Sequence, residues 1–247
     1  MVRELGPDYF PFAIDVLRSA CPPKGFTAHV LGFTLHALLE GLAKGGVPPG
    51  ALDASLPLIL PFVEADVFGG ASEAKEVEAF AKNYKEAKRC RAFEAYQLLA
   101  GMVTFRSQVG ALLAPVRARL GEASSPRVRA KLAQLLQAAA RGALANPTTT
   151  PEALCQFFYA TADAGLAAEE ASRARAGAAS GAAVRTGAGA AGESAADSAA
   201  LHQHLLVEFA LLLLAGGLKR GRVLSAKDPA AAPLLDPLLP LLVRALR

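Results

Sequence analysis

The chain is long enough to bury a sizeable core but is poor in the residues that build sheets. It has 247 residues, of which 53% are hydrophobic and 6% are aromatic, and it lacks tryptophan. Alanine and leucine supply most of the apolar content, and β-branched residues are sparse, so the composition predicts helices rather than strands. The net charge of +4 is compatible with RNA or acidic protein partners but is shared by many other proteins.

Cysteine usage and hydropathy argue against two classes of protein, disulfide-rich proteins and membrane proteins. Cys21, Cys90 and Cys155 are odd in number and far apart, which fits neither a disulfide framework nor a CxxC metal site. The N-terminus lacks the basic, apolar and small-residue regions that follow one another in a signal peptide. The most apolar run, 205–218, contains Glu208 and is shorter than the roughly 20 residues that a bilayer core requires. We therefore expect reduced buried thiols, a wholly buried helix at 205–218 and no membrane partner.

The sequence indicates several helix boundaries. Ser125-Pro126, Thr150-Pro151 and Asp236-Pro237 each place a capping side chain before a proline suited to the first helical position, and Asp228-Pro229 is a fourth candidate. Glycines at 101, 121, 165 and 216 are interpreted as helix ends. The expected helices cover 8–20, 26–42, 53–68, 73–100 (with a break), 105–121, 126–145, 151–165, 199–218 and 234–246.

Short connections between these helices predict helical hairpins. Residues 126–166 form a hairpin of about 40 residues, the size of a HEAT unit, and 236–246 resembles the second helix of another. The predicted fold is therefore all-α, a HEAT/armadillo-like helical-hairpin solenoid, ahead of a closed bundle.

One segment interrupts the helical pattern. Residues 167–198 hold Ala, Gly, Ser and scattered charges, with Val184 as the only large apolar side chain. Such a segment cannot bury enough surface to offset its ordering entropy, so we predict a disordered insertion whose first part could extend the preceding helix by a turn or two. The predicted organisation is hairpins at 1–166, the insertion at 167–198 and further hairpins at 199–247.

The histidines do not have metal-site spacing. His29 and His36 are seven residues apart on one expected helix, which separates them by roughly 10 Å. His202 and His204 are two residues apart, so on a helix they diverge. We expect all four to serve packing or polar surfaces and predict no metal.

No catalytic motif is found. Glu64 and Asp66 are interpreted as two solvated acids at a helix end, without a basic or nucleophilic partner. The run GAGAAG at 187–192 follows no strand and lacks the Lys-Ser/Thr ending of a phosphate loop. The sequence therefore predicts no enzyme activity, no cofactor and no small-molecule substrate.

Basic clusters are the more informative polar feature. Solvated helix faces account for them, but they also fit a surface that tracks RNA phosphates without reading bases. The candidate contact residues for RNA or a partner protein are Lys82, Lys85, Lys88, Arg89, Arg91, Arg127, Arg129, Lys131, Lys219, Arg220 and Arg222.

Several blocks, in collinear order, resemble a nucleolar protein family. They are KGFTAHVLGFTLHALLEGL at 24–42, FGGASEAKEVEAF at 68–80, EAKRCRAFEAYQLLAGMV at 86–103, LLAPVRARL at 112–120, SSPRVRAKLAQLLQAAARGALAN at 124–146, PEALCQFFYATADAGL at 151–166 and HQHLLVEFALLLLAGGLKR at 202–220. The family is called down-regulated in metastasis and is also known as component twenty of the small-subunit processome.

The resemblance implies an interior piece of a long α-solenoid scaffold in the nucleus and nucleolus. Its implied partners are processome proteins and pre-rRNA, its implied role is 18S rRNA maturation and small-subunit assembly, and no active-site residue is carried over. The alternative that the residues leave open is a HEAT-type transport or regulatory adaptor that binds protein partners.

Overall fold

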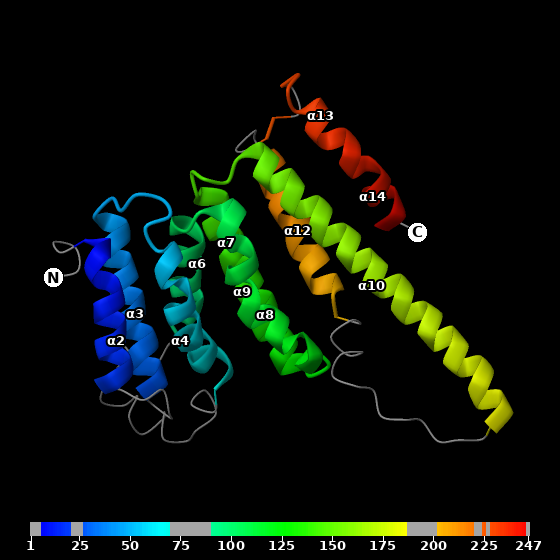
Figure 1. Ribbon diagram of the computed structural model, residues 1–247, viewed down its shortest axis with the longest axis horizontal. Helices are drawn as coiled ribbons and strands as arrows, with labels where there is room; N and C mark the ends of the chain where they lie inside the picture. Colours follow the sequence, from blue (N-terminus) through cyan, green and yellow to red (C-terminus); the bar gives the residue numbers. More distant parts are fainter. Residues whose placement is uncertain are drawn as a thin grey trace. The chain divides into compact units, whose positions relative to one another are not determined.

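The computed structural model describes residues 6–20, 27–69, 90–186, 202–219, 224–225 and 228–245, with side chains except at 27–29, 172, 175–186 and 245. Throughout these ranges the regular secondary structure is helical and no strand is present (Figure 1). The prediction of an all-α fold is confirmed for this part of the chain. The stacking of hairpins into a solenoid stays a prediction.

The elements run as follows along the chain: η1 Pro7–Tyr9, α2 Phe10–Ala20, α3 Thr27–Lys44, η2 Asp53–Ser55, α4 Leu56–Phe68, α6 Ala92–Met102, α7 Phe105–Leu112, α8 Ala114–Arg119, η5 Leu120–Glu122, α9 Pro126–Ala145, α10 Pro151–Thr186, α12 His204–Leu218, α13 Ala232–Leu235, η7 Asp236–Leu238 and α14 Leu239–Ala245. They form two compact units. Unit 1 comprises Met1–Pro115 and Gln134–Thr149, and unit 2 comprises Val116–Ala133 and Thr150–Arg247.

Two of the predicted proline-led helix starts are confirmed. α9 begins at Pro126 and α10 at Pro151, and the Thr150 hydroxyl accepts a hydrogen bond from the Ala153 amide at 3.3 Å. The other two differ. Asp236 is the first residue of the short helix η7, and the Asp228 carboxylate accepts the Ala230 amide at 3.0 Å within a turn.

The core of unit 1 lies where α3 packs against α4 and α6. Leu35 and Leu39 of α3, Ile59 of α4, and Tyr96 and Leu99 of α6 are each at most 2% exposed. Each fully buried side chain of this size stabilises the fold by about 1.5–3 kcal/mol relative to exposure. The Tyr96 hydroxyl also donates to the backbone carbonyl of Leu112, so the buried polar tip of the ring is satisfied.

A buried asparagine ties the end of α6 to the end of α9. The Asn146 amide nitrogen donates to the carbonyl oxygens of Ala100 and Val103 at 2.8 and 2.7 Å, and its oxygen accepts the Thr148 amide at 2.8 Å. Carbonyls at a helix C-terminus lack partners within the helix. Asn146 therefore supplies bonds that the last turn of α6 cannot make for itself.

Glycine allows the two helices to approach closely within unit 1. A Cβ added at Gly142 of α9 would collide with the Gln97 carbonyl oxygen and lie 2.7 Å from the Cβ of Ala100. The neighbouring Ala138 and Ala139 are fully buried. Small side chains at this contact bring the backbones of α6 and α9 together and set the spacing of the longer side chains around it.

The core of unit 2 lies between α10 and α12 (Figure 1). Phe157 and Phe209 meet edge to face, with ring centroids 5.9 Å apart. Gly165, predicted as a helix end, instead lies buried within α10, where an added Cβ would strike the Cγ2 atom of Val207. This prediction is wrong because the glycine serves close helix packing rather than chain reversal.

Helix α10 also continues further than the sequence pattern predicted. It runs to Thr186, whereas the prediction allowed an extension of a turn or two beyond residue 166, and 187–198 lies outside the described residues. The insertion between hairpins stays a prediction. Alanine has the highest helix propensity, and Arg173 pairs with Glu169 one turn earlier at 2.6 Å. The scarcity of large apolar residues in this segment means that it cannot build a core, but it does not prevent a helix.

Helix α12 buries one face only. Leu205, Phe209 and Leu213 are at most 5% exposed, whereas Leu211 and Leu212 are 36% and 46% exposed. The expectation of a wholly buried helix is therefore wrong for the described unit. In addition, no helix in the described part of the chain is long and apolar enough to cross a membrane.

We predict that Gly142→Ala destabilises the chain by about 1–3 kcal/mol, because the new methyl group must push α9 away from α6. Gly41→Ala is the matched control, since a Cβ there meets nothing within 4 Å. That replacement, inside α3, should stabilise the chain by about 0.5–1 kcal/mol. Equilibrium urea unfolding followed by circular dichroism measures both. Equal effects of the two substitutions would contradict the close approach.

Candidate interaction surfaces

More than half of the predicted basic contact residues lie outside the described residues: Lys82, Lys85, Lys88, Arg89, Arg220 and Arg222. The structure places Arg91, Arg127, Arg129, Lys131 and Lys219. Arg91 belongs to unit 1, and the other four residues belong to unit 2.

Arg91 is held within unit 1. Its guanidinium pairs with the carboxylate of Glu94 on the first turn of α6, and the same carboxylate lies 3.7 Å from the imidazole of His36. The Arg91 and Glu94 side chains are each 31% exposed. Arg91 thus compensates a partly exposed acid, and its role as a contact for RNA or a partner protein stays a prediction.

The strongest local positive charge of the described chain falls on residues 116–133, which we call the basic turn. It joins the end of α8 through η5 to the start of α9 and contains five basic residues and one acid, Glu122. Sequence reasoning selected three of the basic residues and missed two on α8. The five are Arg117, Arg119, Arg127, Arg129 and Lys131.

Local bonds order part of the basic turn. Arg119 pairs with Glu122 at 2.8 Å, and the Nε of Arg129 donates to the Ala123 carbonyl at 3.1 Å. Arg127 and Lys131 are four residues apart and share one face of α9, while Arg129 lies between them on another face. Two short basic motifs flank the turn, Val-Arg-Ala-Arg at 116–119 and Arg-Val-Arg-Ala-Lys at 127–131. Their closeness in the sequence is the signal that could have located the whole group.

Lys219 is exposed just beyond the last turn of α12, where its amide bonds to the Ala215 carbonyl. A cation there favours the negative end of the helix dipole.

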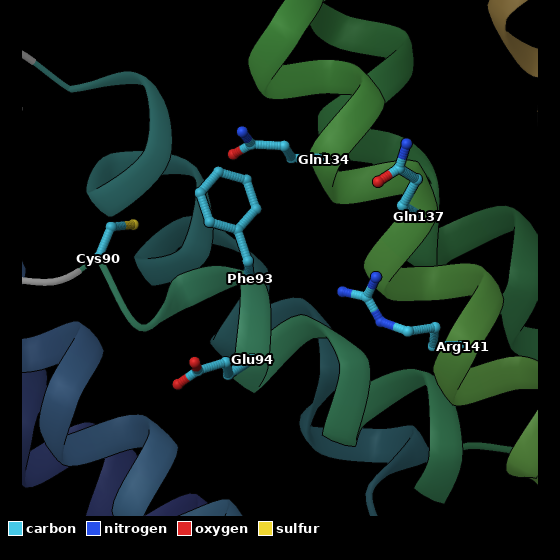
Figure 2. A pocket seen from close by; sticks show the side chains of 6 residues that line it. All are labelled: Cys90, Phe93, Glu94, Gln134, Gln137 and Arg141. Carbon is cyan, nitrogen blue, oxygen red and sulfur yellow. The ribbon is translucent and has the colours of Figure 1, made fainter.

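A polar pocket of about 400 Å³ lies between α6 and α9 within unit 1 (Figure 2). Cys90, Phe93 and Glu94 line its α6 side, and Gln134, Gln137 and Arg141 follow one another along α9. The spacing of the α9 residues, three and four apart, places them on one helix face. Cys90 and Glu94 also contact the α3–α4 side of the unit, through Asp66 and His36.

Asp66 corrects an expectation from the sequence. It is 1% exposed rather than solvated, and the Cys90 thiol donates to its Oδ2 atom at 3.4 Å. An added Cβ on Gly32 would lie 2.8 Å from the Asp66 carboxyl carbon, so the glycine makes room for this acid. Glu64 is two residues away on α4 and more exposed, so the two carboxylates do not form a pair.

The described cysteines and the histidines next to α12 lie in separate surroundings. Cys90 and Cys155 are free thiols, and burial, with the Glu152 carboxylate nearby, raises the pKa of Cys155 above its usual value. His202 precedes α12, so the divergence expected of two helical residues does not apply, and its ring lies 5.9 Å from that of His204. Within the described ranges, no group of three or more His, Cys, Asp or Glu side chains could hold a metal ion.

A salt-bridge clamp attaches α14 to α10 in unit 2. Two nitrogens of Arg244 bond to the two carboxylate oxygens of Glu170 at 2.8 and 2.7 Å, and its Nη1 lies 3.1 Å from Asp163. A hydrogen bond from Arg244 lowers the pKa of Glu170, and the same bond raises the pKa of Arg244. Glu170 lies in the segment predicted to be disordered, and sequence reasoning gave it no role.

The arrangement of the described chain defines an all-α protein whose polar groups mostly cap helices, pair charges and line surface pockets. The comparisons with known proteins identify it further. The family model described as the U3 small nucleolar RNA-associated protein 20 domain matches residues 1–162. The chain belongs to this family, and the resemblance found from the sequence is thereby confirmed.

Two curated relatives each match this chain over the same number of residues. The U3 small nucleolar RNA-associated protein 20 of Schizosaccharomyces pombe and that of Saccharomyces cerevisiae are each 30% identical over 155 residues. The match covers 63% of this chain but 6% of each relative. The family match includes the basic turn and the polar pocket. It ends before Asp163, so the Arg244 clamp and the similarity at 202–220 lie outside it.

We predict that Arg244→Leu loosens α14. A lowered folded-state pKa means that Glu170 stabilises the folded chain above its unfolded pKa, and this contribution is lost as the pH falls through the folded value. Amides of 239–245 should therefore exchange hydrogen faster in the variant at pH 7. At a pH well below about 4, variant and wild type should converge.

The control is Arg173→Leu, which removes a pair within α10 but leaves α14 attached. Exchange of 239–245 that is equal in Arg244→Leu and wild type at pH 7 would show that the clamp does not hold α14.

Proposed function

We propose that this chain is a non-catalytic, HEAT/armadillo-like helical-hairpin scaffold of ribosome biogenesis. In this proposal it acts in the nucleolar small-subunit processome, in 18S rRNA maturation and small-subunit assembly, and docks processome proteins and pre-rRNA. The observation that carries the proposal is membership of the U3 small nucleolar RNA-associated protein 20 family across residues 1–162.

The packing of the described helices supports a scaffold role. Within unit 1, α4 packs against α3, α6 and α7, and within unit 2, α10 packs against α12 and α14. Contacts between helices that are near neighbours along the chain are the pattern from which repeat scaffolds are built. The buried polar residues Asp66 and Asn146 are engaged with neighbouring groups of the fold, which leaves surfaces rather than a reactive centre as the means of action.

The charge distribution supports contact with RNA. The basic turn concentrates five cations in 18 residues, 116–133, against one acid. Cations that neutralise phosphates release condensed counterions, which gives affinity that depends on salt but not on base sequence. The stripe at Lys82, Lys85, Lys88 and Arg89 stays a predicted second surface of the same kind.

Affinity purification tests the proposal directly. The tagged full chain, incubated in nuclear extract from its source cells, should retain U3 small nucleolar RNA, pre-rRNA and processome proteins. Recovery of transport factors or cargo peptides instead would favour the alternative, a HEAT-type adaptor. Retention of none of these RNAs or processome proteins would overturn the proposal.

Charge reversal tests the RNA surface. Arg127→Glu combined with Lys131→Glu should weaken binding to a labelled RNA and lower the slope of log affinity against log salt by about 1–2. The matched control reverses two cations of unit 1, Arg18 and Lys44, which pair with acids on their own helices. Both variants change the net charge equally, so equal losses of affinity would assign the effect to bulk charge and not to the basic turn.

A further inference from the structure

We propose that the polar pocket binds one unpaired nucleotide of RNA, with the base stacked on Phe93 and the phosphate at Arg141. This inference rests on the proposed function that the chain contacts RNA. It goes beyond that function because it assigns a site, a preference for single strands and the contacting groups.

The size and composition of the pocket suit a small planar ligand that carries an anion. Its volume of about 400 Å³ falls within the range of about 300–1,000 Å³ that is typical of small-ligand sites. One aromatic ring, two carboxamides, one guanidinium, one carboxylate and one thiol line it (Figure 2). Unpaired bases are recognised by stacking on aromatic rings combined with hydrogen bonds to their edges.

Phe93 supplies the stacking surface. It is only partly buried, although it lies on the first turn of α6 beside the fully buried Ala92. Its partial exposure leaves part of the ring accessible for a planar ligand to stack on. Stacking of a base on such a ring contributes about 1–3 kcal/mol and tolerates every base.

Gln134 and Gln137 supply groups for the base edge. Both are exposed on α9, and no hydrogen bond joins either amide to another group in the described part of the chain. Each carboxamide presents two donor hydrogens and an acceptor oxygen, which suits the mixed donor and acceptor edges of bases. Neither is committed to holding the fold together.

Arg141 supplies the anion contact and is already oriented. Its Nε donates to the side-chain oxygen of Gln97 at 2.9 Å, and this bond leaves the two terminal nitrogens for a ligand. A guanidinium matches the geometry of phosphate oxygens. The acid at the opposite side of the pocket, Glu94, is paired with Arg91, so its repulsion of a phosphate is reduced.

A second pocket, in unit 2, provides an internal comparison. It has a similar volume of about 420 Å³ and also contains an exposed aromatic ring, Tyr159, and a glutamine, Gln156. Its charged lining residue is Glu152, whose pKa is lowered by a hydrogen bond from its own backbone amide and another from Thr150, so it stays ionised and repels phosphate. Of these two pockets, the one in unit 1 joins an aromatic ring to a cation and the one in unit 2 joins an aromatic ring to an acid.

The test measures fluorescence anisotropy of the full chain with a labelled single-stranded RNA of about ten nucleotides, a length within the usual single-strand site range. Phe93→Leu keeps an apolar side chain but removes the ring, and should weaken binding about tenfold. Phe93→Tyr keeps the ring and should bind like wild type. Arg141→Gln should weaken binding and reduce the salt slope by about 1.

Two controls separate the site from the fold and from bulk charge. Tyr159→Leu makes the same type of change in the second pocket and should leave affinity unchanged. Circular dichroism melting of each variant verifies that it folds. A fully paired RNA of the same length should bind more weakly than the single strand, since paired bases cannot enter the pocket.

Several outcomes overturn the inference. They are wild-type affinity in Phe93→Leu, equal losses in Phe93→Leu and Tyr159→Leu, or equal binding of paired and single-stranded RNA. If the wild-type chain binds no RNA but captures an extended peptide through Gln137, the occupant is a protein and the inference is wrong. Retention of U3 RNA and processome proteins by the Phe93→Leu chain, with unchanged RNA affinity, would sink the nucleotide site while leaving the proposed scaffold function standing.

Discussion

Close approach of helix backbones at glycine is the constraint on which both units depend. In unit 1, Gly142 of α9 allows the Gln97 carbonyl of α6 to pack close to it. In unit 2, Gly165 of α10 allows Val207 of α12 to do the same. Helices that meet at small residues bring their backbones close, so longer side chains are forced to the margins of the contact. In unit 1 that margin carries Gln137 and Arg141, and the polar pocket is a consequence of the same contact.

Polar residues inside the units form hydrogen bonds with neighbouring groups of the fold. Asn146 bonds two carbonyls at the end of α6, and Asp66 accepts from the Cys90 thiol beneath Gly32. A buried polar group costs free energy unless it is hydrogen-bonded, so such groups specify one helix arrangement. Because these buried groups are engaged within the fold, the proposed docking to partners is assigned to groups at the surface.

The described cations differ in the ion pairs that they make. Arg244 joins α14 to α10 through Glu170, and Arg91 pairs with Glu94 on the first turn of α6. The basic turn and Arg141 lie at surfaces within the stretch shared with the U3 small nucleolar RNA-associated protein 20 family. A single count of basic residues could not make this distinction, because charge pairing depends on which helices meet.

The sequence by itself determined the helical class, the starts of α9 and α10 at Pro126 and Pro151, and the family. These follow from local signals: propensity, proline geometry, and the order of blocks along the chain. Only the tertiary structure decided the role of Gly165, the burial of Asp66 and the placement of Phe93 and Arg141 around one pocket. Each of these depends on a helix distant in sequence. Periodicity shows which residues share a face, but not which face of another helix lies opposite.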